Sequence, residues 1–360
     1  MMDLSSTIRL HENDNVVVAR VAIARCAPLN GEGIPAKADI PAGHKVATRR
    51  IPQGSPIIKF NQTIAFASAD IGPGDHVHVH NAAYGKFARN SEVGADVRPT
   101  AYFPEAERAT FEGYRRADGK AGTRNYIGIL TSVNCSATVA RMIAEAFHAP
   151  DSLADYPNVD GVVALVHNTG CGMQAGGEGH DLLKRTIAGY AEHPNFAGVL
   201  LIGLGCEVAQ VGDIGALVPE SGGPAMRTMT IQEEGGTRRT VEKGIALVRE
   251  MLGEANKARR ETLPASELML ALQCGGSDGY SGIGANPALG VAADLLVRHG
   301  GTAILSETPE IYGAEHLLVR RAVSDDVAAK LIERIRWWED YTARNGGEID
   351  NNPAPGNKAG

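Results

Sequence analysis

Four short apolar, β-branched runs in this chain each lead into a cysteine set among small or polar residues, and this pattern constrains the fold most. The runs and their cysteines are 126–131 before Cys135, 161–166 before Cys171, 197–202 before Cys206, and 268–272 before Cys274. A fifth run, 302–305, ends at Ser306 and Glu307 without a cysteine. Runs of about six apolar residues are typical of strands that are buried on both faces of a parallel sheet with helical crossovers.

In parallel sheets, ligands bind beyond the carboxyl ends of the strands, which is where all four cysteines lie. The pattern therefore predicts an α/β region with mostly parallel sheets and a functional rim at the strand ends. The alternative is that these cysteines are small, inert residues of a core, as many free cysteines are.

Helical periodicity fills the intervals between the apolar runs. It predicts helices at about 137–147, 181–192, 237–260, 287–299 and 324–345. Ser136 is the expected N-cap of the first helix, and Pro287 the expected first residue of the fourth.

Composition excludes several classes of function. The 360 residues carry 35 basic and 42 acidic side chains, and the absence of a long Lys/Arg run argues against a nucleic-acid partner. No stretch has the roughly 20 apolar residues needed to cross a bilayer, and the first twelve residues lack a signal-peptide pattern. We therefore expect a cytoplasmic protein with no membrane partner. The five cysteines contain no CxxC pair, and we expect thiols, metal ligands or catalytic groups rather than disulfides.

Residues 7–82 predict a small all-β domain, because turns rich in Pro and Gly at 40–43, 51–54 and 71–74 each precede a short apolar run. Two features of this domain are candidates for chemistry. His44 and Lys45 follow a turn, and His76, His78 and His80 alternate along a predicted strand and would share one face. Three imidazoles on one face can bind a metal or a carboxylate. The alternative is that these histidines form a water-exposed row on a surface strand.

The chain therefore divides into four expected segments. They are an all-β domain at 1–92, a linker at 93–112, an α/β domain at 113–260 and a C-terminal α/β domain at 261–360. Arg124 and Asn125 enter the first apolar run, where they would either meet an anionic substrate or cap backbone and pair on the surface.

Several segments of the chain together resemble the altronate/galactarate dehydratase family. The matching segments are 113–116 with 122–126, 167–172, 203–207, 274–278, and 305–310 with 313–316. The N-terminal domain is similar to the SAF (β-clip) domain of that family, on residues 43–45 and 76–81. The resemblance covers nearly the whole chain. Family members normally continue beyond the motif at 352–360, so the resemblance implies that the C-terminal domain is incomplete in this chain.

The resemblance implies loss of water from a sugar acid: a proton leaves C2, hydroxide leaves C3, and a 2-keto-3-deoxy acid forms. It implies Fe²⁺, or another divalent cation such as Mn²⁺, and an iron–sulfur cluster held by three of the four strand-end cysteines is the alternative.

On the same grounds we assign roles to individual residues. The expected metal ligands are His167, Cys171, Cys206, Glu207 and Cys274. The expected catalytic acid/base groups are His44, Lys45, His78, His80 and Glu307. The expected substrate-binding residues are Arg124, Asn125, Ser277 and Asp278.

Two other functions are compatible with the sequence. One is the elimination of sulfite from sulfolactate by a related lyase, and the other is a truncated, inactive paralogue that acts only as a binding module. The sequence leaves open the identity of the sugar acid and the oligomeric state, for which a homodimer is one option.

Overall fold

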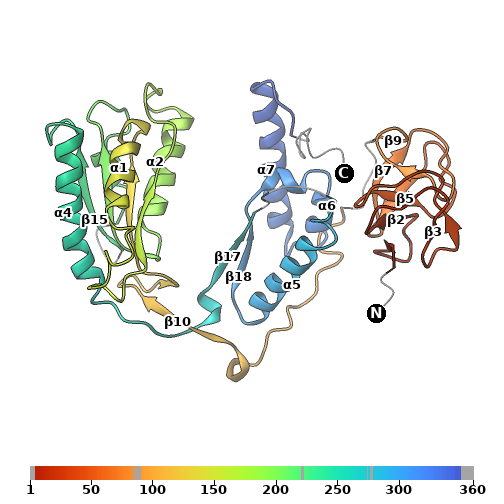
Figure 1. Ribbon diagram of the computed structural model, residues 1–360, viewed down its shortest axis with the longest axis horizontal. Helices are drawn as coiled ribbons and strands as arrows, with labels where there is room; N and C mark the ends of the chain where they lie inside the picture. The colour runs from red at the N-terminus through yellow and green to blue at the C-terminus, as the bar shows by residue number, and fades with distance from the viewer. Residues whose placement is uncertain are drawn as a thin grey trace. The chain divides into compact units, whose positions relative to one another are not determined.

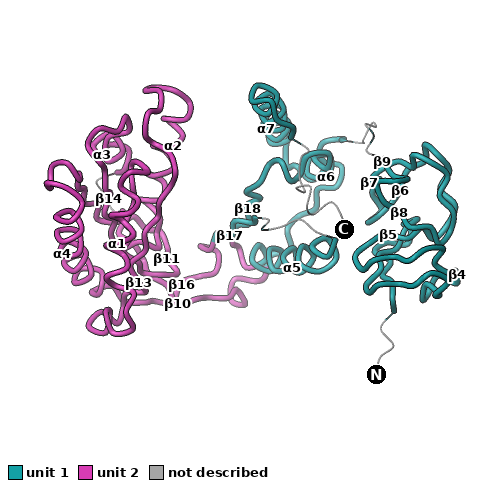
Figure 2. Tube along the Cα trace, turned by 45° about the horizontal axis from the view of Figure 1, so that its top comes forward, with its two compact units in different colours: residues 1–102, 269–298, 302–360 teal, residues 103–268, 299–301 magenta. Residues whose placement is uncertain are grey.

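The computed structural model describes residues 5–83, 85, 91–219, 223–273, 275 and 279–349. The chain divides into two compact units, which Figure 2 shows in different colours. Unit 1 contains Met1–Tyr102, Met269–Arg298 and Thr302–Gly360, and unit 2 contains Phe103–Leu268 and His299–Gly301. The chain therefore begins in unit 1, builds unit 2, and returns to unit 1 for its C-terminal segment.

The N-terminal part of unit 1 consists of short antiparallel strands, which confirms the predicted all-β region (Figure 1). One sheet has the order β1-β2-β5-β8, a second has the order β6-β7-β9, and β3 pairs with β4. The bounds are β1 Thr7–Ile8, β2 Val16–Ala19, β3 Pro28–Leu29, β4 Ile34–Pro35, β5 Lys45–Ala47, β6 Pro56–Lys59, β7 Gln62–Ala67, β8 His76–Val77 and β9 Ala82–Ala83.

Two of the three predicted turns position His44 and the 76–80 segment. Gly43 and Gly74 both adopt φ values near +85°, which side chains disfavour, and each turn leads into a strand of the first sheet. These strands, β5 and β8, pair antiparallel with Val46 opposite His76. The turns therefore bring His44 and the 76–80 segment together from positions more than thirty residues apart.

Unit 2 is organised around a parallel sheet with the strand order β13-β12-β14-β15. Its strands are β12 Tyr126–Thr131, β13 Gly161–Leu165, β14 Phe196–Gly203 and β15 Ala225–Thr230. The first three were predicted from their apolar runs, and the structure confirms them. The fourth strand, β15, was missed because it lies at the sheet edge and Arg227 and Thr228 interrupt its apolar pattern.

Helices cover both faces of this sheet (Figure 1). α1 (Ala137–Glu145) and α4 (Thr237–Ala255) pack on one face through a core that includes Ile129, Ile143 and Leu252. α2 (Glu178–Ala191) and α3 (Val211–Gly215) pack on the other through Leu130, Leu183 and Ile214. Neighbouring residues of β12 thus face opposite cores, as expected for a strand that is buried on both sides.

Some predicted helix ends are wrong. α4 stops at Ala255, not at Arg260, because the chain leaves the helix at Asn256 and enters β16 (Glu261–Pro264). β16 pairs with β10 (Thr110–Arg115), which in turn pairs with β11 (Ala121–Gly122). Ser136 is the N-cap residue of α1, as predicted, but its hydroxyl makes no capping hydrogen bond and donates instead to the carbonyls of Val133 and Ile202.

The C-terminal segment of unit 1 begins with a parallel β-α-β element. β17 (Met269–Leu272) pairs with β18 (Thr302–Leu305), and α5 (Ala285–Arg298) connects them. α5 begins two residues before Pro287, so the predicted first position of this proline is wrong. α6 (Glu315–Val319) and α7 (Asp325–Arg344) follow, and the Ser324 side chain caps α7 by accepting a hydrogen bond from the Val327 backbone N–H.

The fourth apolar run therefore does not join the sheet of the first three. β17 belongs to the separate β17-β18 sheet, and the two sheets lie in different units. A common rim that carries all four cysteines is thus not formed within one sheet. Among the described residues, no helix has the length and apolar character that crossing a bilayer requires.

Candidate functional site

The carboxyl ends of β12, β13 and β14 carry loops that each expose a cysteine. Cys135, Cys171 and Cys206 are all exposed free thiols. Two of these loops are joined through the backbone, since the Asn134 N–H donates to the Thr169 carbonyl over 2.9 Å. Gly170, with φ of +102°, packs so closely on the β12 end that a Cβ there would lie 2.8 Å from the Ser132 oxygen. The loops therefore hold the thiols at one edge of the sheet, as the strand pattern predicted.

The three thiols interact electrostatically. The pKa of Cys135 is raised above its ordinary value, mainly by desolvation. The charge and the hydrogen bond of Cys171 raise it further, and so does the charge of Cys206. Cys135 was not among the five residues assigned as metal ligands, although the iron–sulfur alternative included it among the four strand-end cysteines. We call Cys135, Cys171 and Cys206 the thiol trio.

The Glu207 side chain is buried beneath the strand-end loops and holds the Cys206 loop in place. Its carboxylate accepts hydrogen bonds from the Ser132 hydroxyl (2.7 Å) and from the backbone N–H groups of Leu204 (3.1 Å) and Gly205 (2.6 Å). Burial alone would raise the pKa of Glu207, but these hydrogen bonds outweigh it and the pKa is lowered. Because both carboxylate oxygens accept hydrogen bonds, Glu207 positions the Cys206 loop, and its role as a metal ligand stays a prediction.

His167 is likewise engaged by its own loop. Its Nε2 lies 2.9 Å from the Thr131 carbonyl, and its Nδ1 accepts from the Thr169 N–H over 3.3 Å. A metal ligand needs a nitrogen with an available lone pair. In this arrangement both ring nitrogens are engaged, and the metal role of His167 stays a prediction.

Arg124 and Asn125 lie at the amino-terminal ends of the strands, just before β12 begins, whereas the thiol trio lies at the carboxyl ends. Six residues of strand, about 20 Å, separate them from the thiol trio. Asn125 is fully buried, and its amide donates to the carbonyls of Asn158 (2.7 Å) and Ala255 (2.9 Å) and accepts from Arg116 (2.9 Å). Of the two roles left open for Asn125, the structure supports the cap on backbone groups and not the contact with substrate.

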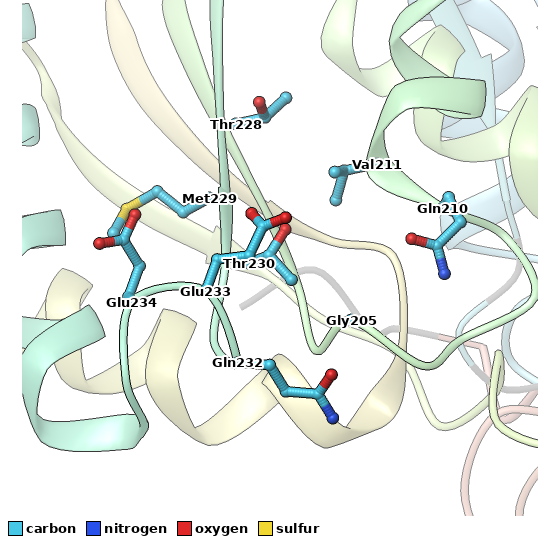
Figure 3. Close-up of a pocket in the computed structure, with 9 residues that line it drawn as sticks. All are labelled: Gly205, Gln210, Val211, Thr228, Met229, Thr230, Gln232, Glu233 and Glu234. Carbon is cyan, nitrogen blue, oxygen red and sulfur yellow. The ribbon is translucent and has the colours of Figure 1, made fainter.

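A polar cavity of about 250 Å³ adjoins the Cys206 loop (Figure 3). It lies at the carboxyl ends of β14 and β15, and hydroxyl, amide and carboxylate groups provide most of its lining. The lining residues are Gly205, Gln210, Val211, Thr228, Met229, Thr230, Gln232, Glu233 and Glu234. This cavity was not predicted, because the apolar pattern did not indicate β15. Its many hydrogen-bonding groups suit a ligand rich in hydroxyls.

The second concentration of chemical groups lies in the β region of unit 1. His44 Nδ1 and His76 Nε2 are 2.8 Å apart, the rings of His44 and His78 stack with centroids 5.1 Å apart, and the ring of His80 lies 5.4 Å from that of His76. The expected long strand is wrong, because β8 ends at Val77. The rings nevertheless gather, and Asn81 holds the turn through the His76 carbonyl and the His78 N–H. We call His44, His76, His78 and His80 the histidine cluster.

Burial lowers the pKa of three basic groups in and around the histidine cluster. The pKa of His76 falls to about 4, through burial first and then through the charges of His44, His78, His80 and Lys45. Burial also lowers the pKa of Lys45, and burial together with Lys45 lowers that of Lys59. The cluster is therefore a set of interacting bases of which at least one stays neutral in neutral solution.

The remaining predicted site residues belong to the C-terminal segment. Cys274, Ser277 and Asp278 lie outside the described residues. Glu307 is half-buried after β18, and its carboxylate lies 3.5 Å from the Gln273 amide.

The donor set at the thiol trio suits iron. Thiolates are soft ligands that select iron–sulfur clusters, zinc and Cu(I). Within the part of the chain that the structure describes, no three His, Cys, Asp or Glu side chains stand in metal-ligand geometry. The three thiols are exposed.

Comparisons with known families cover nearly the whole chain. Residues 5–84 match the altronate/galactarate dehydratase SAF domain. Residues 113–256 match the second domain of D-galactarate dehydratase/altronate hydrolase, and residues 265–360 match the C-terminal domain of D-galactarate/altronate dehydratase.

Individual relatives agree with these matches. Altronate dehydratase of Bacillus subtilis (strain 168) is 34% identical over 366 residues, covering 99% of this chain and 71% of the relative. Galactarate dehydratase (L-threo-forming) of Escherichia coli (strain K12) is 37% identical over 362 residues, covering 98% of this chain and 69% of the relative. The (2R)-sulfolactate sulfo-lyase subunit beta of Chromohalobacter salexigens is 34% identical over 223 residues, covering 62% and 53%.

Proposed function

Because this chain belongs to the altronate/galactarate dehydratase family of hydro-lyases, we propose that it removes water from a sugar acid of the altronate or galactarate type. The product would be a 2-keto-3-deoxy acid. The observation that carries this proposal is the thiol trio, which three separate loops bring to the carboxyl ends of the strands in unit 2, where parallel sheets bind ligands. The identity of 34–37% to two sugar-acid dehydratases over nearly the whole chain supports it.

The reaction requires that a weakly acidic proton leaves C2, next to a carboxylate that is already negative. We propose that Cys135, Cys171 and Cys206 hold iron here, and that an iron–sulfur cluster suits this donor set better than a single Fe²⁺ or Mn²⁺ ion, because His167 and Glu207 are engaged elsewhere. When bound, such a group would supply Lewis-acid stabilisation of the charge that develops on the substrate.

The polar cavity beside Cys206 would hold the hydroxyl-rich part of the substrate. Thr228, Thr230 and Gln232 offer hydroxyl and amide groups, which both donate and accept hydrogen bonds. The buried carboxylate of Glu207 keeps the Gly203–Cys206 loop in place next to the cavity through its hydrogen bonds to two backbone N–H groups of that loop.

We further propose that the histidine cluster and Lys45 move the protons. A general base works best when its pKa lies near the working pH, and such groups typically contribute about 10²–10⁴-fold. Burial lowers the pKa of Lys45 from its ordinary value, and the low pKa of His76 keeps that ring neutral and available as a proton acceptor. His44, His78 and His80 are the side chains assigned to this role, and Glu307 is a further candidate base.

The test is turnover with iron-loaded protein, prepared without oxygen, on D-altronate and galactarate, with the 2-keto-3-deoxy acid measured directly. We expect product from the unmodified chain and from Cys26→Ser, which removes an exposed cysteine in unit 1, far along the chain from the thiol trio. We expect at least about a hundredfold loss from Cys171→Ser and from His78→Ala. Unchanged turnover in both variants would refute the proposed site.

One observation favours a second substrate class. The likeness to a (2R)-sulfolactate sulfo-lyase subunit extends over 62% of this chain, and elimination next to a carboxylate serves both reactions. The same assay with (2R)-sulfolactate and sulfite detection separates the two: sulfite release without sugar-acid turnover would replace the dehydratase proposal. No turnover of any of the three acids, together with no shift in melting temperature, would favour a binding module.

A further inference from the structure

The polar cavity beside the Cys206 loop carries negative charge and no cation in its lining. Among the described residues, that lining contains the carboxylates of Glu233 and Glu234 but no Lys, Arg or His side chain (Figure 3). Glu234 is neutralised from outside the cavity, because Lys243 Nζ lies 2.6 and 2.8 Å from its two oxygens. Glu233 is exposed and forms no ion pair within the part of the chain that the structure describes. A ligand in the cavity therefore meets the uncompensated charge of Glu233.

The backbone amides that border the cavity are already engaged. The N–H groups of Leu204 and Gly205 donate to the Glu207 carboxylate over 3.1 and 2.6 Å, and the Gln232 N–H donates to the Leu204 carbonyl over 3.0 Å. The side-chain amide of Gln210 donates to the Glu207 carbonyl. A carboxylate that leaves water needs such donors, or a cation, in exchange. These groups are not free to supply that exchange.

The groups that remain suit neutral hydroxyls. The side chains of Thr228, Thr230 and Gln232 line the cavity and can both donate and accept hydrogen bonds, whereas the Glu233 carboxylate can only accept them. A substrate hydroxyl can donate to Glu233 and accept from a threonine or from Gln232. A second substrate carboxylate has no proton to donate, and Glu233 repels it.

We propose that this cavity holds the end of the substrate that is remote from the reacting carboxylate, and that Glu233 excludes substrates whose remote end is a second carboxylate. The chain then acts on aldonic acids, which have one carboxylate and a hydroxymethyl end, in preference to aldaric acids, which have two. This inference rests on the proposed function, because it assigns the substrate class of the same site.

The test compares two acids that differ only at C6. They are D-altronate and the diacid obtained by oxidising its C6 to a carboxylate. With iron-loaded protein we expect kcat/KM for D-altronate to exceed that for the diacid at least about tenfold. The ratio should fall as salt is added, because salt screens the charge of Glu233. Equal kcat/KM values for the two acids, or a higher value for the diacid, would overturn the proposal.

Substitutions at Glu233 assign the effect to this side chain. Glu233→Gln keeps the size and removes the charge, so the ratio should fall at least about fivefold, and Glu233→Lys should favour the diacid. Glu254→Gln is the matched control, since it neutralises a carboxylate that is 72% exposed near the end of α4 and pairs with Lys257. A ratio that stays the same in Glu233→Gln, or that changes equally in Glu254→Gln, would overturn the proposal.

Binding separates this inference from the proposed function. Equilibrium dialysis with Cys171→Ser, in which we expect little turnover, measures the affinity for each acid without the reaction. If the unmodified chain turns over neither acid, but Cys171→Ser binds D-altronate more tightly than the diacid and Glu233→Gln removes the difference, the proposed function fails and the selectivity stands. Turnover of both acids without discrimination overturns the selectivity alone. Neither binding nor turnover of either acid overturns both.

Discussion

At the scale of the residue, Arg124 and Asn125 show how two neighbouring polar side chains come to have different roles. Both precede β12, but Arg124 is exposed, whereas Asn125 is completely buried and its amide makes three hydrogen bonds within 2.9 Å. A buried amide with all its partners holds the surrounding backbone, and its removal leaves buried carbonyl groups without donors.

We therefore predict that Asn125→Ala lowers the free energy of unfolding by about 1–3 kcal/mol, whereas Arg124→Ala changes it by no more than about 0.5 kcal/mol. Urea unfolding followed by circular dichroism measures both. If Asn125→Ala instead leaves stability intact and raises KM for the sugar acid, Asn125 contacts substrate and its structural assignment is wrong.

The pKa of His76 predicts how the stability of the folded chain changes with pH. Its pKa is about 4 in the folded chain and about 6.5 when unfolded, so the unfolded chain binds more protons between these values. Stability should therefore fall as the pH is lowered from 6.5 toward 4, and the neutral ring should persist above that window. His76→Gln should flatten this part of the profile, while His148→Gln, at an exposed histidine of unit 2, should not. An NMR titration that places the pKa of His76 near 6.5 would contradict the burial argument.

At the scale of the element, the loop after β13 decides where Cys171 lies. Gly170 and Gly172 flank this cysteine, and both have positive φ, at +102° and +67°. A Cβ on Gly170 would meet the Ser132 oxygen and the Val133 Cα within 3 Å, whereas a Cβ on Gly172 would meet nothing within 4 Å.

Alanine at either position strains the backbone, but only Gly170→Ala should also displace the loop from β12. We predict a cost of about 1 kcal/mol for Gly172→Ala, a larger cost for Gly170→Ala, and a clear loss of iron binding only in the latter. Calorimetric melting and iron content after loading measure the two effects. Equal iron content in both variants would mean that the loop position does not govern the thiol trio.

The elements also show what the sequence predicts and why. β12, β13 and β14 were predictable because strands that are buried on both faces must be apolar at nearly every position. β15 was not, because an edge strand tolerates Arg227 and Thr228. The apolar pattern of β17 correctly indicated a strand, but no local pattern encodes which sheet a strand joins, and β17 pairs with β18 instead of joining the sheet of β12, β13 and β14.

At the scale of the whole molecule, the sequence predicts which residue types lie at the strand ends of the candidate site. It predicts the role of each of these residues less well. Parallel topology alone places Cys135, Cys171 and Cys206 at one edge. The roles of His167 and Glu207 depend on hydrogen bonds to Thr131, Ser132 and Gly205, which only the folded loops reveal. The histidine cluster was predicted from alternation along a strand, but a turn held by Asn81 and the pairing of β5 with β8 produce it instead.

The thiol trio is the central claim, and iron content tests it most directly. The chain is loaded with Fe²⁺ and sulfide without oxygen, desalted, and measured for iron per chain and for visible absorption, beside Cys26→Ser and a variant in which Cys135, Cys171 and Cys206 are all serine. We predict bound iron and a broad band at the blue end of the visible spectrum in the unmodified chain and in Cys26→Ser, and neither in the triple variant. Iron and absorption retained by the triple variant would contradict the account.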